Sequence, residues 1–153
     1  MKLSEILSPE LIIHNLSVTN KSESINALID LFEGDSRVNN LQGVKTAVFD
    51  RETIMSTGVG HGFAIPHGKT DSVNEIIAAF ARTSAPLEFD SLDGQPVRLI
   101  FLLVGKENLV GPHIKLLSRI SRMMNQDEFR NKLLDAASSE ELFNLFKEEE
   151  AKM

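Results

Sequence analysis

Two histidines lie in a glycine-rich stretch near the middle of the chain, Gly58-Val59-Gly60-His61-Gly62-Phe63-Ala64-Ile65-Pro66-His67-Gly68-Lys69. Glycine allows backbone N–H groups to approach an anion closely, because no Cβ stands in the way. Pro66 restricts the backbone just before His67, and Lys69 adds a positive charge nearby. The segment therefore indicates an anion site, although a surface loop with incidental histidines fits the spacing equally well.

A third histidine, His113, follows Gly111-Pro112 where apolar periodicity predicts the start of a helix. Because proline is favoured at the first helical position, we expect Gly111 to cap this helix and His113 to lie in its first turn. Free N–H donors at such an end attract phosphate, and the partial positive charge disfavours an imidazolium. We expect His113 to be neutral near pH 7; the alternative is a polar residue at a helix start without a function.

Together these residues fit a site that carries a phosphoryl group for a short time. A neutral imidazole is nucleophilic near physiological pH and can accept such a group. The protein must then position the acceptor and neutralise the charge on the phosphoryl oxygens. Backbone near Gly68, the helix start at His113 and the guanidinium of Arg51 are predicted to do so. This exchange needs neither a metal nor a nucleotide, so no cofactor is predicted.

Apolar periodicity also predicts the elements that position these residues. Helices are expected from a cap at Asn20 to Gly34, over 41–55, after Pro112 with a buried stripe of Ile114, Leu117, Ile120 and Met124, over 128–136, and after a cap at Ser138. Extended segments are expected at 11–14, 63–65, 75–82, 87–89 and 97–104. Asp93-Gly94 is a strong turn dipeptide and indicates antiparallel pairing of its flanking strands. The pattern favours an α/β fold with a mixed, parallel and antiparallel, β-sheet.

Length and composition limit the class of protein. The chain has 153 residues, which predicts a single domain over 1–153. It holds 22 acidic and 16 basic side chains, a net charge of −6, which disfavours binding to nucleic acid or to an anionic membrane surface. It contains no cysteine, so disulfides and thiolate chemistry are excluded. No apolar run approaches the roughly 20 residues of a membrane span, and the N-terminus does not read as a secretory signal, so we expect a cytoplasmic protein without membrane insertion.

The glycine-rich motif resembles the active-site signature of a known family. Ser56-Thr57-Gly58-Val59-Gly60, followed by Gly62 to Lys69, is similar to the signature of fructose/mannitol-type enzyme IIA components of the bacterial phosphoenolpyruvate-dependent phosphotransferase system. This family includes nitrogen-regulatory members. The resemblance covers nearly the whole chain, from Leu3–Pro9 to His113 and Leu116-Leu117. It implies a mixed sheet covered by helices on both faces.

The resemblance also implies roles for individual residues. His67 would accept the phosphoryl group, His113 would support it and contact phosphate, and Arg51 would contact phosphate or a partner protein. The position of His61 varies in the family, and we group it with Gly68 and Lys69 as a supporting residue. The implied donor is a histidine-phosphocarrier protein, and the implied acceptor is an enzyme IIB domain or a regulatory target.

Three further readings stay open at this point. Within the family, the chain is either a nitrogen-regulatory carrier, which its N-terminal stretch and compact length favour, or a fructose- or mannitol-specific sugar-transport component. It could also be a regulatory module that binds partners according to its phosphorylation without passing the phosphoryl group on. A distant alternative is a metal-dependent hydrolase with His61, His67 and His113 as ligands, although no carboxylate lies in the motif to act as a general base.

Overall fold

The computed structural model describes residues 1–153 as six α-helices, one 3₁₀ helix and six strands. The helices are α1 (Leu3–Ile6), α2 (Lys21–Asp30), α3 (Leu41–Ile54), α4 (Val110–Met124), α5 (Asp127–Asp135) and α6 (Ser139–Ala151), and the 3₁₀ helix is η1 (Pro9–Leu11). The strands are β1 (Ile12–Leu16), β2 (Gly58–Gly60), β3 (Phe63–Ala64), β4 (His67–Lys69), β5 (Ile77–Leu87) and β6 (Val97–Gly105). Helices occupy both ends of the chain, and α2 and α3 lie between β1 and the other five strands.

The strands form one mixed sheet in the order β1-β5-β6-β3-β2, and β4 also pairs with β6. β5 and β6 are antiparallel across the predicted turn. β1 pairs with β5 in parallel, and so do β3 and β4 with β6. Both short strands therefore lie along one edge of β6, with Phe63 opposite Leu99 and His67 opposite Leu103. This register places His67 near the carboxyl end of the central strand.

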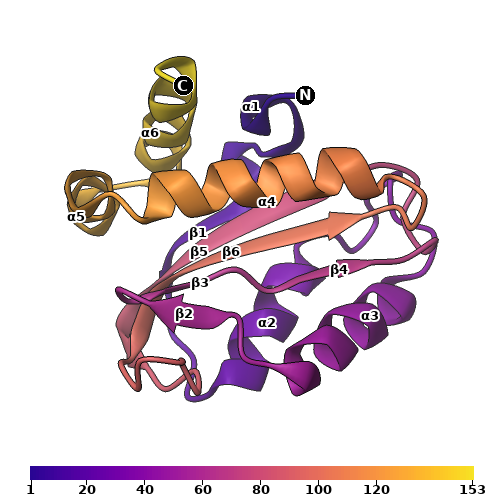
Figure 1. Ribbon diagram of the computed structural model, residues 1–153, viewed down its shortest axis with the longest axis horizontal. Helices are drawn as coiled ribbons and strands as arrows, with labels where there is room; N and C mark the ends of the chain where they lie inside the picture. The colour runs from indigo at the N-terminus through magenta and orange to yellow at the C-terminus, as the bar shows by residue number, and fades with distance from the viewer.

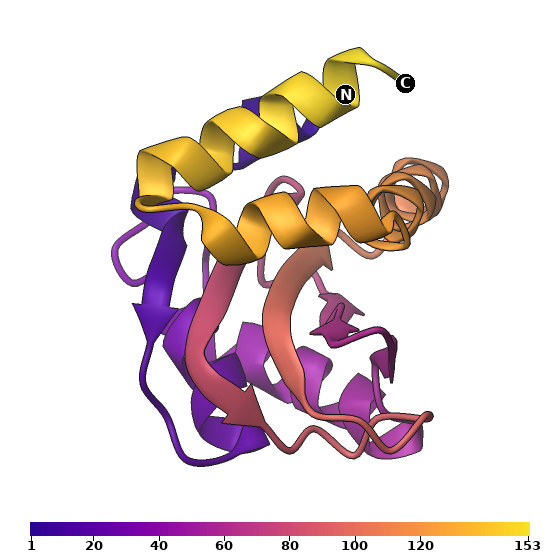
Figure 2. The ribbon, with the colours of Figure 1, turned by 90° about the vertical axis from the view of Figure 1, so that its left-hand side faces the viewer.

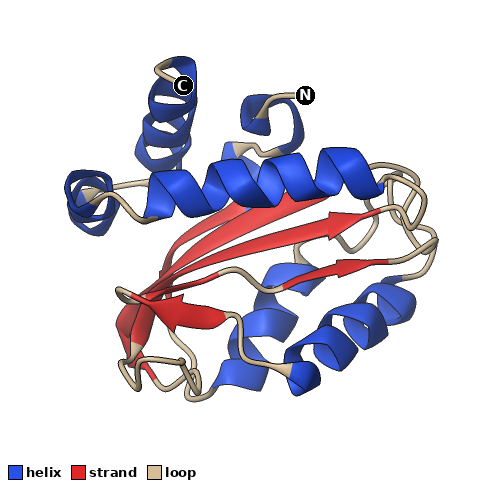
Figure 3. Cartoon of the chain, viewed as in Figure 1, coloured by secondary structure: helices blue, strands red, loops and turns tan.

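Helices cover both faces of the sheet. Figures 1 and 2 show α4, α5, α6 and the short α1 on one face and α2 with α3 on the other. Figure 3 shows the same arrangement by element type, with the strands enclosed between two helical layers. The predicted α/β fold, a mixed sheet covered on both faces, is confirmed.

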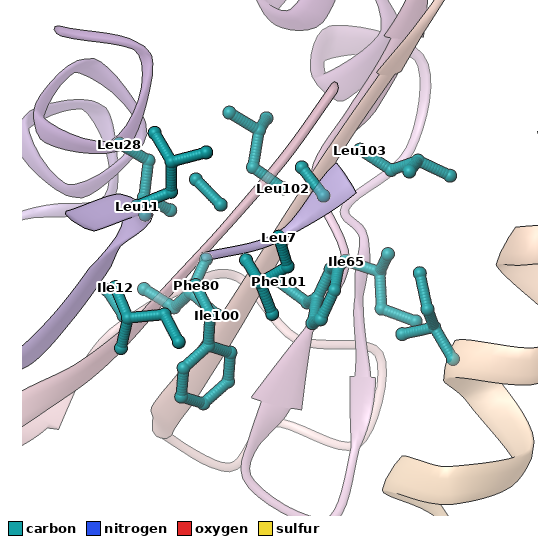
Figure 4. Close-up of a cluster of buried hydrophobic side chains, with 14 of the residues drawn as sticks. Leu7, Leu11, Ile12, Leu28, Ile65, Phe80, Ile100, Phe101, Leu102 and Leu103 are labelled. Atoms are coloured by element: carbon teal, nitrogen blue, oxygen red, sulfur yellow. The ribbon is translucent and has the colours of Figure 1, made fainter. Parts of the chain in front are cut away.

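The core lies on both sides of β6, whose residues are buried except for Arg98. Phe80 and Phe101 pack against Phe146 of α6 with ring centroids 4.9 and 5.3 Å apart. Figure 4 shows Phe80 and Phe101 among aliphatic side chains such as Leu28 of α2. Burial on both faces explains why the sequence of this strand is a continuous apolar run without alternation.

Helix caps are well predicted, with one local difference. Asn20 accepts a hydrogen bond from the Glu23 N–H at 2.9 Å and caps α2. The Glu23 carboxylate accepts from the N–H and hydroxyl of Thr19, the residue before the cap. α2 itself ends at Asp30, and a turn leads to Gly34, which has a φ of +80°.

The expected separate strand over 87–89 is wrong. β5 continues to Leu87, and a register shift between Arg82 and Leu87 absorbs the intervening residues. Pro86 has no N–H to donate to a regular ladder, which explains the irregularity. Arg98 of β6 donates to the Thr83 carbonyl from Nε and Nη2 at 3.1 and 2.7 Å and holds this part of β5 in place.

Candidate functional site

A cavity of about 850 Å³ lies among α3, β4 and the first turns of α4. Figure 1 shows β4 running between these two helices. His67, His113, Arg51, Gly68 and Lys69 all line this cavity. The structure therefore brings together five of the six residues that the sequence singled out.

His67 is held in one tautomer by the backbone. Its Nδ1 lies 2.8 Å from the carbonyl oxygen of Ile65. Because a carbonyl only accepts, Nδ1 carries the proton and Nε2 keeps its lone pair. Burial lowers the pKa of His67, and the charges of Arg51 and Lys69 lower it further, against the opposing effects of the Ile65 hydrogen bond and of Glu52. The ring is therefore a neutral base at pH 7.

His113 faces the same cavity from α4. Its side chain is buried, with 3% of the residue surface exposed, and neither ring nitrogen has a hydrogen-bond partner in the protein. The ring centroids of His113 and His67 are 6.0 Å apart. Burial, together with His67 and Lys69, lowers the pKa of His113 to about 4. A buried neutral imidazole with two unsatisfied nitrogens is typical of a site that receives a ligand.

The start of α4 differs from the prediction. The helix begins at Val110, so Gly111 is not its cap and Pro112 is its third residue. The N–H of His113 donates to the carbonyl of Leu109 at 3.1 Å, so it does not face a ligand. Only Val110 and Gly111 have free N–H groups in the first turn, since proline has none. His113 therefore contributes its side chain to the cavity and not its backbone.

Two glycines allow the elements around the cavity to pack closely. A Cβ on Gly68 would lie 3.2 Å from the carbonyl carbon of Ala47, so its absence brings α3 and Arg51 against β4. A Cβ on Gly105 would lie 2.6 Å from Nδ1 of His113. Gly105 was not among the residues predicted from the sequence. The available signal was a glycine at the end of a buried strand, which often marks a close approach.

A buried carboxylate anchors the beginning of the signature. Glu52 accepts hydrogen bonds from the N–H and hydroxyl of Thr57 at 2.8 and 2.6 Å, and Lys21 Nζ lies 2.8 Å from it. Arg51, the preceding residue, donates from Nη1 to the Met55 carbonyl at 2.9 Å at the end of α3. The Ser-Thr-Gly part of the motif thus fixes the end of the helix that carries Arg51.

The predicted buried stripe of α4 is partly wrong. Ile114 is 56% exposed and lies at the cavity edge with Leu117 and with Ile54, which is 79% exposed. The buried face is rotated towards His113, Leu116, Ile120, Met123 and Met124. Because the helix presents His113 to the sheet, the neighbouring Ile114 must face outward. An apolar rim consequently borders the two histidines.

The structure separates His61 from the other predicted residues. It lies on the turn between β2 and β3, and it lines a different cavity with Arg98 and Arg130. Its predicted role as a supporting residue at the His67 cavity is therefore corrected. The hypothesis of a hydrolase with three histidine ligands fails for the same reason, since no three His, Cys, Asp or Glu side chains cluster with metal-binding geometry.

None of the helices combines the length and apolar character that a membrane crossing requires.

The fold and the paired histidines point to a component of a phosphotransferase. Comparison with known proteins identifies the family: the chain belongs to the phosphoenolpyruvate-dependent sugar phosphotransferase system EIIA 2 family, whose model matches residues 5–149. This match confirms the family resemblance that the signature motif indicated.

Relatives of more than one kind are similar to the chain. A nitrogen regulatory protein of Bradyrhizobium diazoefficiens is 32% identical over 145 residues, 95% of this chain and 94% of that protein. A fructose-specific EIIA component of Haloferax volcanii is 35% identical over 138 residues, 90% of each. A fructose-specific EIIABC component of Bacillus subtilis is 34% identical over 145 residues, and the chain spans only 23% of its length.

Solved structures agree with the fold. The nitrogen regulatory protein IIA-Ntr of Neisseria meningitidis superposes with a TM-score of 0.89 at 35% identity, over 94% of this chain and 98% of that one. A complex of enzyme IIAMTL with phosphorylated enzyme IIBMTL from Escherichia coli contains a chain with a TM-score of 0.79 at 19% identity, over 94% of this chain and 99% of that one. At that identity, the second likeness concerns the fold alone.

Proposed function

We propose that this chain is a single enzyme IIA domain that carries a phosphoryl group on Nε2 of His67. The observation that carries the proposal is the 2.8 Å contact between Nδ1 of His67 and the Ile65 carbonyl, which leaves Nε2 as the only nucleophilic nitrogen of this ring. The ring lines a cavity that also holds two cationic side chains, Arg51 and Lys69. These features supply a positioned acceptor and compensating charge, the two requirements of phosphoryl transfer.

The transfer balances without a cofactor. The lone pair of Nε2 attacks phosphorus, a P–N bond forms, and the P–N bond of the donor phosphohistidine breaks with its electron pair returning to the donor imidazole. The Nδ1 proton stays on His67 and keeps its hydrogen bond to Ile65. The ring then carries a positive charge beside the phosphoryl dianion, so no proton must move during the step.

His113 is proposed to bind the phosphoryl oxygens. Its lowered pKa leaves it neutral, with one N–H to donate, and its unpaired nitrogens are already desolvated. A donor that needs no reorganisation is an efficient stabiliser of developing charge. Arg51 and Lys69 neutralise the remaining charge, while Gly68 lets α3 come close enough for Arg51 to reach the cavity.

The proposed donor is a histidine-phosphocarrier protein, and the proposed acceptor is an enzyme IIB domain or a regulatory target. The apolar rim of Ile54, Ile114 and Leu117 supports protein partners, since exposed apolar groups around a polar site suit an interface. A structural neighbour was solved with phosphorylated IIBMTL bound, which supports the same kind of acceptor. The likeness to the nitrogen regulatory protein IIA-Ntr, with a TM-score of 0.89, supports a regulatory carrier. The fructose-specific EIIA component of Haloferax volcanii, which matches over 90% of its length, supports the alternative of a sugar-specific carrier.

The test is phosphorylation by a complete donor chain. The protein is incubated with phosphoenolpyruvate, enzyme I and the histidine-phosphocarrier protein, and its intact mass is recorded in neutral buffer. We expect one phosphoryl group on the natural chain and none on His67→Ala. His113→Ala should slow labelling by about 10²-fold, the usual cost of losing one donor to developing charge.

His14→Ala is the matched control, because His14 is an exposed histidine on β1 and far from the cavity. It should label like the natural chain. Full labelling of folded His67→Ala would overturn the assignment. A chase with a IIB domain then separates a carrier, which loses its phosphoryl group rapidly, from a module that retains it.

A further inference from the structure

The cavity that holds His67 is larger than a single phosphoryl group requires. Its volume of about 850 Å³ falls within the range of roughly 300–1,000 Å³ that is typical of clefts for small molecules. It lies beside β4 between α3 and α4, which Figure 1 shows at the edge of the sheet. Ile54, Lys69 and Ile114 line it and are exposed, so the cavity opens to solvent. A small phosphodonor therefore has room to approach His67 without a partner protein.

The two cationic side chains of the cavity are available to an anion. Neither Arg51 nor Lys69 forms an ion pair with a carboxylate of the chain. Arg51 donates from Nη1 to the Met55 carbonyl at 2.9 Å, which leaves Nε and Nη2 without a partner in the protein. Unpaired guanidinium and ammonium groups bind phosphoryl and carboxylate oxygens. The cavity can therefore hold both charged parts of a small donor.

Two carboxylates limit the charge that the cavity accepts. Asp50 and Glu107 line it together with Arg51 and Lys69, so two negative charges accompany two positive ones. Because both histidines are neutral, the formal charge of the lining is zero. A ligand with several negative charges is repelled by the carboxylates more strongly than a small dianion is. The lining thus favours a small donor over a nucleoside triphosphate.

The state of the histidines restricts the leaving group. Nδ1 of His67 is committed to the Ile65 carbonyl at 2.8 Å, and burial keeps His113 neutral by lowering its pKa to about 4. Neither ring can act as the general acid that the alkoxide of a phosphate monoester needs. A carboxylate is a stable anion and departs without a proton. An acyl phosphate therefore requires less of this site than a monoester does.

We propose that His67 also accepts a phosphoryl group directly from a small acyl phosphate bound in this cavity. The lone pair of Nε2 attacks phosphorus, a P–N bond forms, and the P–O bond to the acyl group breaks with its electron pair on the carboxylate oxygen. The phosphoryl group lies against the two cationic side chains, and the acyl group contacts the apolar rim. The inference rests on the proposed function, because it uses the same acceptor nitrogen, but it needs no protein donor.

The test is incubation of the full chain with acetyl phosphate alone at neutral pH, followed by intact mass and peptide mapping. We expect one phosphoryl group on His67, at a rate that saturates with acetyl phosphate. Labelling of His67 should be faster than that of the exposed His14 by about tenfold or more. His67→Ala should not be labelled at position 67 or elsewhere at a comparable rate. Glycerol phosphate and ATP, supplied in parallel, should not label the chain.

Arg51→Gln tests whether the donor is bound by the cavity. We expect it to slow labelling by acetyl phosphate about tenfold, since it removes a charged hydrogen-bond donor beside the acceptor. Arg122→Gln is the matched control, because it removes the same charge from an arginine that lines a separate surface pocket. It should be labelled as the natural chain is. Equal rates in the two variants would overturn the proposal.

The same preparation is also labelled through the protein donor chain, which separates the two proposals. Labelling by that chain but not by acetyl phosphate would overturn this inference and leave the proposed function intact. A rate that rises linearly with acetyl phosphate, or that is equal at His14 and His67, would also overturn it, because either result means reaction without a bound donor. Labelling by acetyl phosphate but not by the protein chain would support the small donor and contradict the proposed protein donor.

Discussion

The proposed reactivity of His67 depends on the hydrogen bond that its ring makes to its own backbone. The Ile65 carbonyl lies two residues before His67, with Pro66 between them, so a restricted segment of backbone holds Nδ1. A free histidine samples both tautomers, whereas this one presents Nε2 at all times. The local sequence Ile-Pro-His thus supplies both the proposed nucleophile and the carbonyl that orients it.

The positive charge of Arg51 should lower the pKa of His67 by a measurable amount. Arg51 is one of the groups that lower it, because a nearby cation disfavours the imidazolium. We expect Arg51→Gln to raise the pKa of His67 in an NMR titration. Lys45→Gln, on the same helix but paired with Asp30, should leave the titration unchanged. An unchanged or lower pKa in Arg51→Gln would show that this charge does not act on the ring.

For single residues, the sequence indicates which side chains can do chemistry, but it does not show which of them lie close together. The shared cavity of His67, His113 and Arg51 could be predicted, because their residue types and the surrounding motif indicate a common site. His61 could not be placed, because it is six residues from His67 but is separated from it by a turn at His61 and Gly62 with positive φ. Two short strands of three and two residues carry no periodicity that would reveal that turn.

At the level of elements, the site is an intersection of β4, β6 and α4. β4 and β6 run parallel, with Lys69 opposite Gly105, so both end at the cavity. Ligands commonly bind outside the carboxyl ends of parallel strands. α4 crosses this end and places His113 directly over Gly105.

Gly105 should control the position of His113. In Gly105→Ala the new Cβ would lie 2.6 Å from Nδ1, so the imidazole must move. We expect slower labelling of His67 and a loss of about 1–3 kcal/mol in the free energy of unfolding, the usual cost of overpacking. Labelling kinetics and urea unfolding would measure both.

Gly111→Ala is the control for this change, because nothing lies within 4 Å of a Cβ at that position. It should label normally, and its free energy of unfolding should change little, because the helix preference of alanine is opposed by the restriction that Pro112 places on the side chain before it. If Gly105→Ala labels as fast as Gly111→Ala, close packing at Gly105 is unimportant for the site.

Element types could be predicted from the sequence, but details of their ends and faces could not. The apolar run of β6 and the caps of α2 and α6 carry strong local signals. The start of α4 and the outward face of Ile114 depend on how His113 packs on Gly105, a tertiary contact that periodicity does not encode.

Across the whole molecule, two helical layers bury the sheet and desolvate the histidine pair at its edge. That desolvation couples folding to pH. The pKa of His113 in the folded protein, about 4, is below the usual value of 6.5, so the unfolded chain binds a proton more readily in that range. The free energy of unfolding therefore decreases as the pH falls from 6.5 towards 4, because protonation of His113 favours the unfolded chain. Above pH 6.5 His113 causes no such loss.

Urea unfolding of the natural chain and of His113→Gln at pH 7 and pH 4.5 tests this coupling. Carboxylates titrate in both proteins, so the difference between them isolates the histidine. We expect the natural chain to lose more stability on acidification than the variant, by up to about 2 kcal/mol. Equal losses would mean that His113 is not held neutral by the fold.

The proposed chemistry is tested most directly by the nitrogen that carries phosphorus. The protein is labelled with ¹⁵N-histidine and phosphorylated through the donor chain, and ³¹P–¹⁵N coupling is recorded in neutral buffer. We predict coupling to Nε2 of His67, with the Nδ1 proton retained on the Ile65 carbonyl. Phosphorus on Nδ1, or on any residue other than His67, would contradict the mechanism.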